Sequence, residues 1–117
     1  MTHLPHDHGQ HTKKILAQFP DIQDFESSAE LFTQLSDTTR LRLFWLLCHC
    51  EECVINLSAI MEMSSPAISH HLKLLKSAGL IVSRREGKEV YYTIADNTKA
   101  QALHRSLESI LSISCPV

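Results

Sequence analysis

Three cysteines and a histidine stand within six positions of this sequence, in the stretch CHCEEC, as Cys48, His49, Cys50 and Cys53. Thiolate sulfur and imidazole nitrogen are soft or borderline donors, so such a cluster can bind a metal ion, form a disulfide or act as a redox switch. The C-x-x-C spacing of Cys50 and Cys53 lets one turn of backbone present two thiolates to a single ion. Which chemistry applies depends on the compartment and on the elements that carry the cluster.

The composition favours a single small domain in the cytoplasm. The 117 residues are 44% hydrophobic and contain no apolar run long enough to span a membrane. The first residues, MTHLPHDHGQH, are polar, so we expect neither a secretory signal nor a membrane partner. Thiols stay reduced in the cytoplasm, where clustered cysteines bind metals or act in catalysis more often than they form disulfides.

The net charge of −2 is unevenly distributed. Residues 63–94 carry five Lys or Arg and only two acidic side chains, whereas the residues before them are acidic on balance. A local basic surface is the electrostatic footprint that binding to DNA requires. The pattern therefore indicates a nucleic-acid partner for this segment despite the acidic total.

Four helices are predicted from apolar side chains that recur every three or four residues. They span about residues 22–35, 39–47, 54–61 and 65–78. The side chains of the third helix that are expected to point inward are Leu57, Ile60 and Met61. The fourth helix is the clearest, because Ser65 is a good N-cap, Pro66 suits the first helical position and Gly79 ends the helix.

After the fourth helix the hydrophobic period changes from about 3.6 to 2, which predicts a β-hairpin. We expect its turn at Glu86–Gly87, since glycine accepts a positive φ. Pairing across that turn sets Arg85 beside Lys88. It also sets Arg84 opposite Glu89 as an attractive cross-strand pair.

A helix-turn-helix followed at once by a basic hairpin is a winged helix-turn-helix, so the predicted fold is mainly α with a small β-hairpin. The segments in order are a flexible arm containing histidines at 1–20 and one domain at 21–114, which holds the helix-turn-helix at about 54–78, the wing at about 80–94 and a last helix at about 96–113. The helix at about 65–78 is the second of the helix-turn-helix, and the small hydroxyl residues at its start suit entry into the major groove of DNA. The predicted DNA contacts are Ser64, Ser65, Ser69, His70, Lys73 and Lys76 on this helix and Arg84, Arg85 and Lys88 on the wing.

Three stretches, LSDTTRLRLFWLL, SSPAISHHLKLLKSAGLI and SRREGKEVYYTI, together with the cysteine at 53, resemble the ArsR/SmtB family of metal-sensing repressors. The resemblance covers roughly residues 25–95, and SHHLKLLKSAGL is its most specific part. It implies a homodimer held by the first and last helices, which binds an imperfect palindrome of double-stranded DNA and leaves it when metal binds. The side chains expected in that dimer contact include Leu103, Leu107 and Ile110.

Two types of metal site in this family can be compared with the sequence. In one, the ligands lie on the last helix, and the matching positions here are Asp96, Thr98, Ser109 and Ser112. Only the first of these is a ligand type, so we expect this site to be absent. The other lies at the start of the third helix, where the family often has CVCD. This chain has CVIN there, which keeps Cys53 and loses the second cysteine.

Upstream residues can replace the lost ligand. The expected ligands are Cys50 and Cys53, completed by Cys48 or His49 and by an arm histidine of the same or the other protomer, His6 or His8. A mixed thiolate–imidazole set of four fits a tetrahedral Zn²⁺ or Cd²⁺ ion as inducer.

Less specific interpretations of these residues stay open. Cys48 could pack in the core as a small hydrophobic residue. The arm histidines could form a solvated tail, and His104, alone on the last helix, is typical of a surface or interface position. Cys115 is expected to be a frayed thiol, or a ligand if the tail folds back.

Three other functions compete with metal sensing. A thiol-redox repressor could use Cys48, Cys50 and Cys53, although the neighbouring Glu51 and Glu52 would raise the thiol pKa and so disfavour it. A structural zinc module in an adaptor protein is a further alternative. An enzyme with a small-molecule substrate is disfavoured, because a chain this small leaves little room for a pocket beside its DNA-reading elements.

Overall fold

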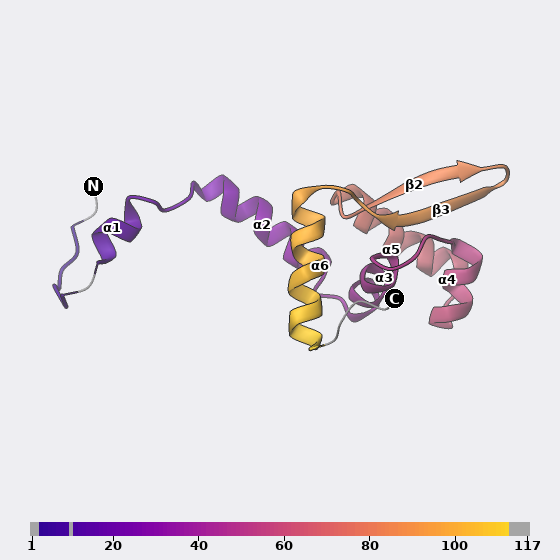
Figure 1. Ribbon diagram of the computed structural model, residues 1–117, viewed down its shortest axis with the longest axis horizontal. Helices are drawn as coiled ribbons and strands as arrows, with labels where there is room; N and C mark the ends of the chain where they lie inside the picture. The colour runs from indigo at the N-terminus through magenta and orange to yellow at the C-terminus, as the bar shows by residue number, and fades with distance from the viewer. Residues whose placement is uncertain (1–2, 10, 113–117) are drawn as a thin grey trace.

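The computed structural model describes residues 3–9 and 11–112, in which most elements are helices and one small sheet extends beyond them at one end (Figure 1). The elements in order are α1 (Thr12–Leu16), α2 (Ile22–Gln34), α3 (Thr38–Leu47), β1 (Glu52–Cys53), α4 (Val54–Met61), α5 (Ser65–Ser77), β2 (Ile81–Glu86), β3 (Glu89–Ile94) and α6 (Thr98–Leu111). Figure 1 shows the arm and α1 at one end of the long axis and the tip of the β2–β3 hairpin at the other. None of the helices in the described residues is long and apolar enough to cross a membrane.

The core is built around α5, which packs against α3, α4 and β2. Its buried stripe is Ile68, Leu72 and Leu75, which recur at helical spacing as the sequence predicts. The largest fully buried side chains of the core are Leu43, Phe44, Leu47, Leu57, Ile68, Leu72, Leu75, Leu80 and Ile81. Each such side chain contributes about 1.5–3 kcal/mol relative to an exposed one. The packed centre therefore gives α5 a rigid support on its inner side and leaves its outer side to solvent.

The start of α5 lies one residue earlier than predicted. Ser64, not Ser65, is the N-cap, and its hydroxyl accepts a hydrogen bond from the Ala67 backbone N–H at 3.3 Å. Ser65 is then the first helical residue, with Pro66 also in the first turn. Both serines satisfy the general preference for a hydroxyl at this position, so sequence alone did not separate them. The helix-turn-helix itself is confirmed.

In α4, Leu57 and Met61 are buried as predicted, but the expectation for Ile60 is wrong, because its side chain is 52% exposed. Leu57 and Met61 are four residues apart and share one face, whereas Ile60 lies to the side of that face. The helix ends at Met61, and its C-cap residue, Glu62, adopts the left-handed conformation with φ 54°. This residue begins the short turn into α5.

The hairpin has a different register from the predicted one. Arg84 pairs with Tyr91, Arg85 with Val90, and Glu86 with Glu89. The two-residue turn consists of Gly87 and Lys88, so the predicted Arg84–Glu89 and Arg85–Lys88 pairs are wrong. Gly87 has φ +62° and takes the first turn position, where the primed hairpin turns require a positive φ.

A third strand, β1, joins the hairpin to form an antiparallel sheet in the order β1-β3-β2. It consists of Glu52 and Cys53, which pair with Tyr92 and Tyr91. A strand of two residues is too short to show a period of two, so no sequence pattern predicts it. It places the end of the cysteine cluster directly against the wing.

The last helix, α6, begins after Asn97, whose side chain accepts a hydrogen bond from the Ala100 N–H at 2.8 Å. It is therefore shorter at its start than predicted, and residue 113 lies outside the described part of the chain. Of the three predicted dimer residues, Leu107 is buried and Leu103 packs against the same core, whereas Ile110 is 79% exposed. Only Ile110 thus faces outward from the protomer.

The N-terminal helices contribute little to the core. A short α1 lies within the segment predicted as an arm, and α2 has no buried residue. The apolar side chains Ile22, Phe25 and Phe32 of α2 are exposed by 72%, 48% and 63%. A single protomer therefore leaves one apolar face of α2 open to solvent.

Candidate DNA interface and metal-ligand clusters

The outer face of α5 and the β2–β3 hairpin both carry exposed polar side chains. All nine residues predicted to contact DNA are exposed: Ser64, Ser65, Ser69, His70, Lys73, Lys76, Arg84, Arg85 and Lys88. The opposite face of α5 is buried, because the apolar stripe occupies it. A polar outer face on a well-supported helix is the arrangement that a helix entering the major groove requires.

Several of these side chains already have partners within the protein. Ser64 caps α5, and the Ser65 hydroxyl lies 3.1 Å from the hydroxyl of Ser58 on α4. The Lys76 ammonium donates to the Ser83 hydroxyl at 2.7 Å and so connects α5 with β2. These contacts fix the orientation of the helix relative to its supporting helix and to the wing.

Arg84 is the most strongly engaged residue of the wing. Its guanidinium donates to Glu51 at 2.5 and 2.8 Å and to Glu86 at 2.6 Å, and it lies 4.8 Å from the centre of the Tyr91 ring. Hydrogen bonds to Glu51 and then to Glu86 raise the pKa of Arg84, and the bond from Arg84 lowers the pKa of Glu51. Arg84 would therefore have to release carboxylates to reach a phosphate.

The other cations of the surface are less constrained. Within the residues that the structure describes, Lys73, Arg85 and Lys88 take part in no ion pair. All three side chains are exposed. Lys76 donates only to a neutral hydroxyl, so it too has no carboxylate partner among the described residues.

His71, the neighbour of the predicted contact His70, has a structural role. Its Nδ1 lies 3.3 Å from an Arg40 guanidinium nitrogen and 4.0 Å from the Asp37 carboxylate. Asp37 in turn caps α3 by accepting a hydrogen bond from the Arg40 backbone N–H, and this bond is the main reason that the pKa of Asp37 lies below its usual value. The group connects α5 to the start of α3.

The cysteines lie where α3 ends and α4 begins. Cys48 is the C-cap of α3 and packs against the core. Cys50 donates its thiol to the Leu46 carbonyl at 3.3 Å, and Cys53 is only 8% exposed at the N-cap of α4. Cys50 and Cys53 are free thiols. Burial, followed by the charge of Glu52, raises the pKa of Cys50.

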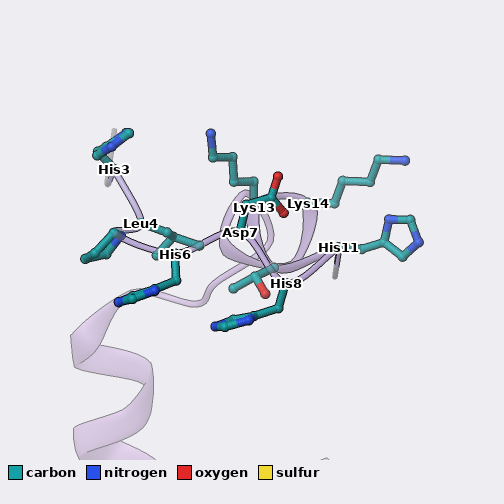
Figure 2. Close-up of a pocket in the computed structure, with 10 residues that line it drawn as sticks. His3, Leu4, His6, Asp7, His8, His11, Lys13 and Lys14 are labelled. Atoms are coloured by element: carbon teal, nitrogen blue, oxygen red, sulfur yellow. The ribbon is translucent and has the colours of Figure 1, made fainter.

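These cysteines do not converge on one point within a single protomer. Among the described residues, no set of three or more ligand atoms within 4.8 Å of one another includes a cysteine. Figure 2 shows His6 and His8 projecting to the same side of the arm, and their rings stack with centroids 5.7 Å apart. The arm lies far from the cysteines of the same chain (Figure 1). Cys115 lies outside the described residues.

A second group of potential ligands was missed by the sequence analysis. Nε2 of His49 lies 2.7 Å from Oε1 of Glu108, and Nε2 of His104 lies 2.9 Å from the same oxygen. These are the only three potential ligand residues that cluster within 4.8 Å in the described part of the chain. The i, i+4 spacing of His104 and Glu108 on α6 is visible in the sequence, but His49 lies 59 residues before Glu108, and no local pattern connects residues so far apart.

Comparison with known proteins gives consistent results. The family model for bacterial regulatory proteins of the arsR family matches residues 37–83. A transcriptional repressor SmtB homolog from Synechocystis is 38% identical over 77% of this chain and 68% of its own length. A cadmium resistance transcriptional regulatory protein CadC homolog from Staphylococcus aureus is 36% identical over 91% of this chain and 85% of its own. The chain belongs to the ArsR family.

Solved structures agree with this ArsR-family assignment. HlyU from Vibrio cholerae N16961 has a TM-score of 0.70 and 28% identity, over 76% of this chain and 96% of the other. The homodimeric winged helix-turn-helix DNA-binding domain of a possible ArsR-family regulator from Mycobacterium bovis has a TM-score of 0.69 and 27% identity, over 78% and 83%. The winged helix-turn-helix fold is thus confirmed, and the ArsR family consists of DNA-binding transcriptional regulators rather than enzymes.

Proposed function

We propose that this chain is a cytoplasmic, homodimeric transcriptional repressor that binds operator DNA and releases it when Zn²⁺ or Cd²⁺ binds near Cys53. The observation that carries the proposal is the exposed polar face of α5 beside a basic wing, both connected to Cys53 through α4 and β1. Relatives named as a cadmium resistance regulator and as SmtB repressors support the metal response.

In the DNA-bound state, α5 enters the major groove with its first turn nearest the bases. Ser64, Ser65, Ser69 and His70 supply hydrogen-bonding groups that can reach base edges, and the lysines of α5 face the backbone. Arg85 and Lys88 extend the contact to flanking phosphates. Arg84 joins them only if it exchanges its carboxylate partners for a phosphate.

The dimer is formed by the outward apolar faces of α2 and α6. Phe25 and Phe32 on α2 and Ile110 on α6 are exposed in one protomer, and a second copy would remove this surface from water. Leu107 and Leu103 support the face from within. Two α5 helices then meet half-sites of a palindrome roughly 34–36 Å apart, which is about one turn of DNA.

Cys50 and Cys53 are the proposed core of the sensing site. Their soft donors suit Zn²⁺ or Cd²⁺, and the remaining ligands are Cys48 or His49 and an arm histidine, His6 or His8. Because the arm lies far from the cysteines of its own protomer, the arm ligand comes from the partner subunit (Figure 1). Metal binding requires deprotonated thiols.

Cys53 is well placed to transmit a signal. It occupies the N-cap position of α4, the helix that supports α5, and it pairs with Tyr91 of the wing strand β3. Cys53 is also 8% exposed, so binding an ion must shift it from its packed position. Such a shift moves both DNA-reading elements together. Coupling of about 1–3 kcal/mol is typical for allostery, and it acts equally on metal and on DNA affinity.

Thiol-redox sensing is less well supported. Reactive cysteines have a lowered pKa, whereas burial and the Glu52 carboxylate raise the pKa of Cys50. A raised pKa reduces the thiolate fraction that attacks an oxidant at neutral pH. The same thiol remains a competent ligand, since a bound cation itself favours the thiolate.

The test measures binding of reduced, metal-free protein to a duplex selected from random sequence, by fluorescence anisotropy with and without Zn²⁺ or Cd²⁺. We expect metal to weaken wild-type binding by roughly 5- to 150-fold. Cys53→Ser should bind the duplex nearly normally and remain bound when metal is added. Deletion of residues 1–12 should weaken metal affinity and leave metal-free DNA binding unchanged. Release of Cys53→Ser at the wild-type metal concentration would place the sensing site elsewhere.

A further inference from the structure

The cluster of His49, His104 and Glu108 lies outside the thiol site and joins two distant parts of the chain. His49 follows the end of α3, and the other two residues face it from one side of α6. Their side chains are only 12%, 14% and 12% exposed. Three ligand-type groups have thus been brought together and largely withdrawn from water, at a position that no DNA contact uses.

The geometry of the three donor atoms is close to that of a metal site. Both imidazole Nε2 atoms approach one carboxylate oxygen of Glu108, at 2.7 and 2.9 Å. Around a tetrahedral ion with bonds of about 2.0–2.1 Å, neighbouring donors are about 3.3 Å apart. The donors therefore need to separate by only about half an ångström to admit an ion. Side-chain rotations of that size need no change of backbone.

The surroundings favour ligation by Nε2. The Trp45 ring packs against His49 with centroids 4.6 Å apart, and the rings of His49 and His104 meet edge to face at 5.0 Å. These contacts hold both rings with Nε2 directed toward Glu108. Ligation requires the lone pair of each Nε2 and leaves the proton on Nδ1, which is an available tautomer of neutral histidine.

We propose that His49, His104 and Glu108 form a Zn²⁺ site that is separate from the cysteines. Two imidazoles and one carboxylate are donors that suit Zn²⁺, and three protein ligands leave one tetrahedral position for water or another ligand. The site joins the end of α3 to α6 and so holds the helix that carries Ile110. Because His49 belongs to this site, Cys48 is the third ligand of the thiol site.

Co²⁺ distinguishes the two sites because thiolate ligands add an intense charge-transfer band that imidazole and carboxylate do not. The test uses the full chain carrying Cys50→Ser and Cys53→Ser, titrated with Co²⁺ beside a chelator that strips weakly held ions. We expect one Co²⁺ per chain with a tetrahedral visible spectrum, no thiolate band, and displacement by Zn²⁺. Circular dichroism checks that the variant is folded.

Adding His104→Gln to that background should raise the dissociation constant by more than the ~10- to 100-fold that loss of an outer-shell partner costs. Glu26→Gln, an exposed glutamate on α2, is the matched control and should change nothing. A folded background variant that binds neither Co²⁺ nor Zn²⁺ overturns the proposal. So does equal affinity with and without His104→Gln.

Wild-type protein gives a second measurement that does not depend on the serine variants. We expect two Zn²⁺ per chain, falling to one in His104→Gln, with the thiolate band of the Co²⁺ form retained. An unchanged count in His104→Gln overturns the proposal, and the cluster is then a hydrogen-bonded contact between α3 and α6. A wild-type spectrum without a thiolate band contradicts the cysteine sensing site instead, so the two proposals fail separately.

Discussion

Replacing Arg85 by glutamine is expected to weaken DNA binding by an amount that depends on salt. Arg85 is exposed on β2 and has no ion-pair partner among the described residues. A dimer loses two phosphate contacts in this variant. Each contact contributes about 0.9 to the slope of log affinity against log salt, so the slope should become shallower by about 1.8. Between about 50 and 200 mM salt, wild-type affinity then falls roughly 12-fold more than that of the variant.

Arg84→Gln is the matched comparison on the same strand. Arg84 already pairs with Glu51 and Glu86, so binding a phosphate would release few counterions and the slope should change by less than one unit. Affinity should still fall, because two carboxylates then face the DNA uncompensated. Both variants are measured by anisotropy on one duplex at four or more salt concentrations. A wild-type slope in Arg85→Gln would refute contact between this side chain and phosphate. If the salt slope changes equally in both variants, Arg84 releases its carboxylates when the protein binds DNA.

Three further predictions follow from the other elements. Ile110→Asp should give a folded monomer by light scattering with weakened binding to palindromic DNA, whereas Leu107→Asp should unfold the chain, because Leu107 is buried in its own protomer. Asp37→Ala removes the cap of α3 and should cost about 0.5–2 kcal/mol in urea unfolding. The folded-state pKa of Asp37 lies below its usual value, so its contribution is present above the usual carboxyl range and is lost as pH falls through the folded-state pKa. The stabilities of wild type and variant should therefore converge in acid, and a constant difference would contradict this. Alkylation of Cys50 in a Cys48→Ser, Cys53→Ser variant, with Cys115 blocked by substitution, should have a midpoint above the ordinary thiol pKa; a midpoint below it would revive redox sensing.

Most of the helix-turn-helix and the wing can be predicted from interactions between residues close together in the sequence. The bounds of α4, the buried stripe of α5 and the glycine that follows it depend on residues within a few positions of one another, so their spacing is sufficient to predict them. The existence of the hairpin follows from its period of two. Its register does not follow from the sequence, because a glycine with positive φ suits either turn position, and only the observed pairing of Glu86 with Glu89 shows that Gly87 takes the first one.

Contacts between distant residues decided the rest. The pairing of Arg84 with Glu51 links residues 33 positions apart, and that of His49 with Glu108 links residues 59 apart. No periodicity reports such a contact, because it depends on how two elements pack and not on either element alone. For the same reason, the sequence placed Leu103, Leu107 and Ile110 on one apolar side of α6. Only packing against the core determined that Leu107 faces inward and that Ile110 faces solvent.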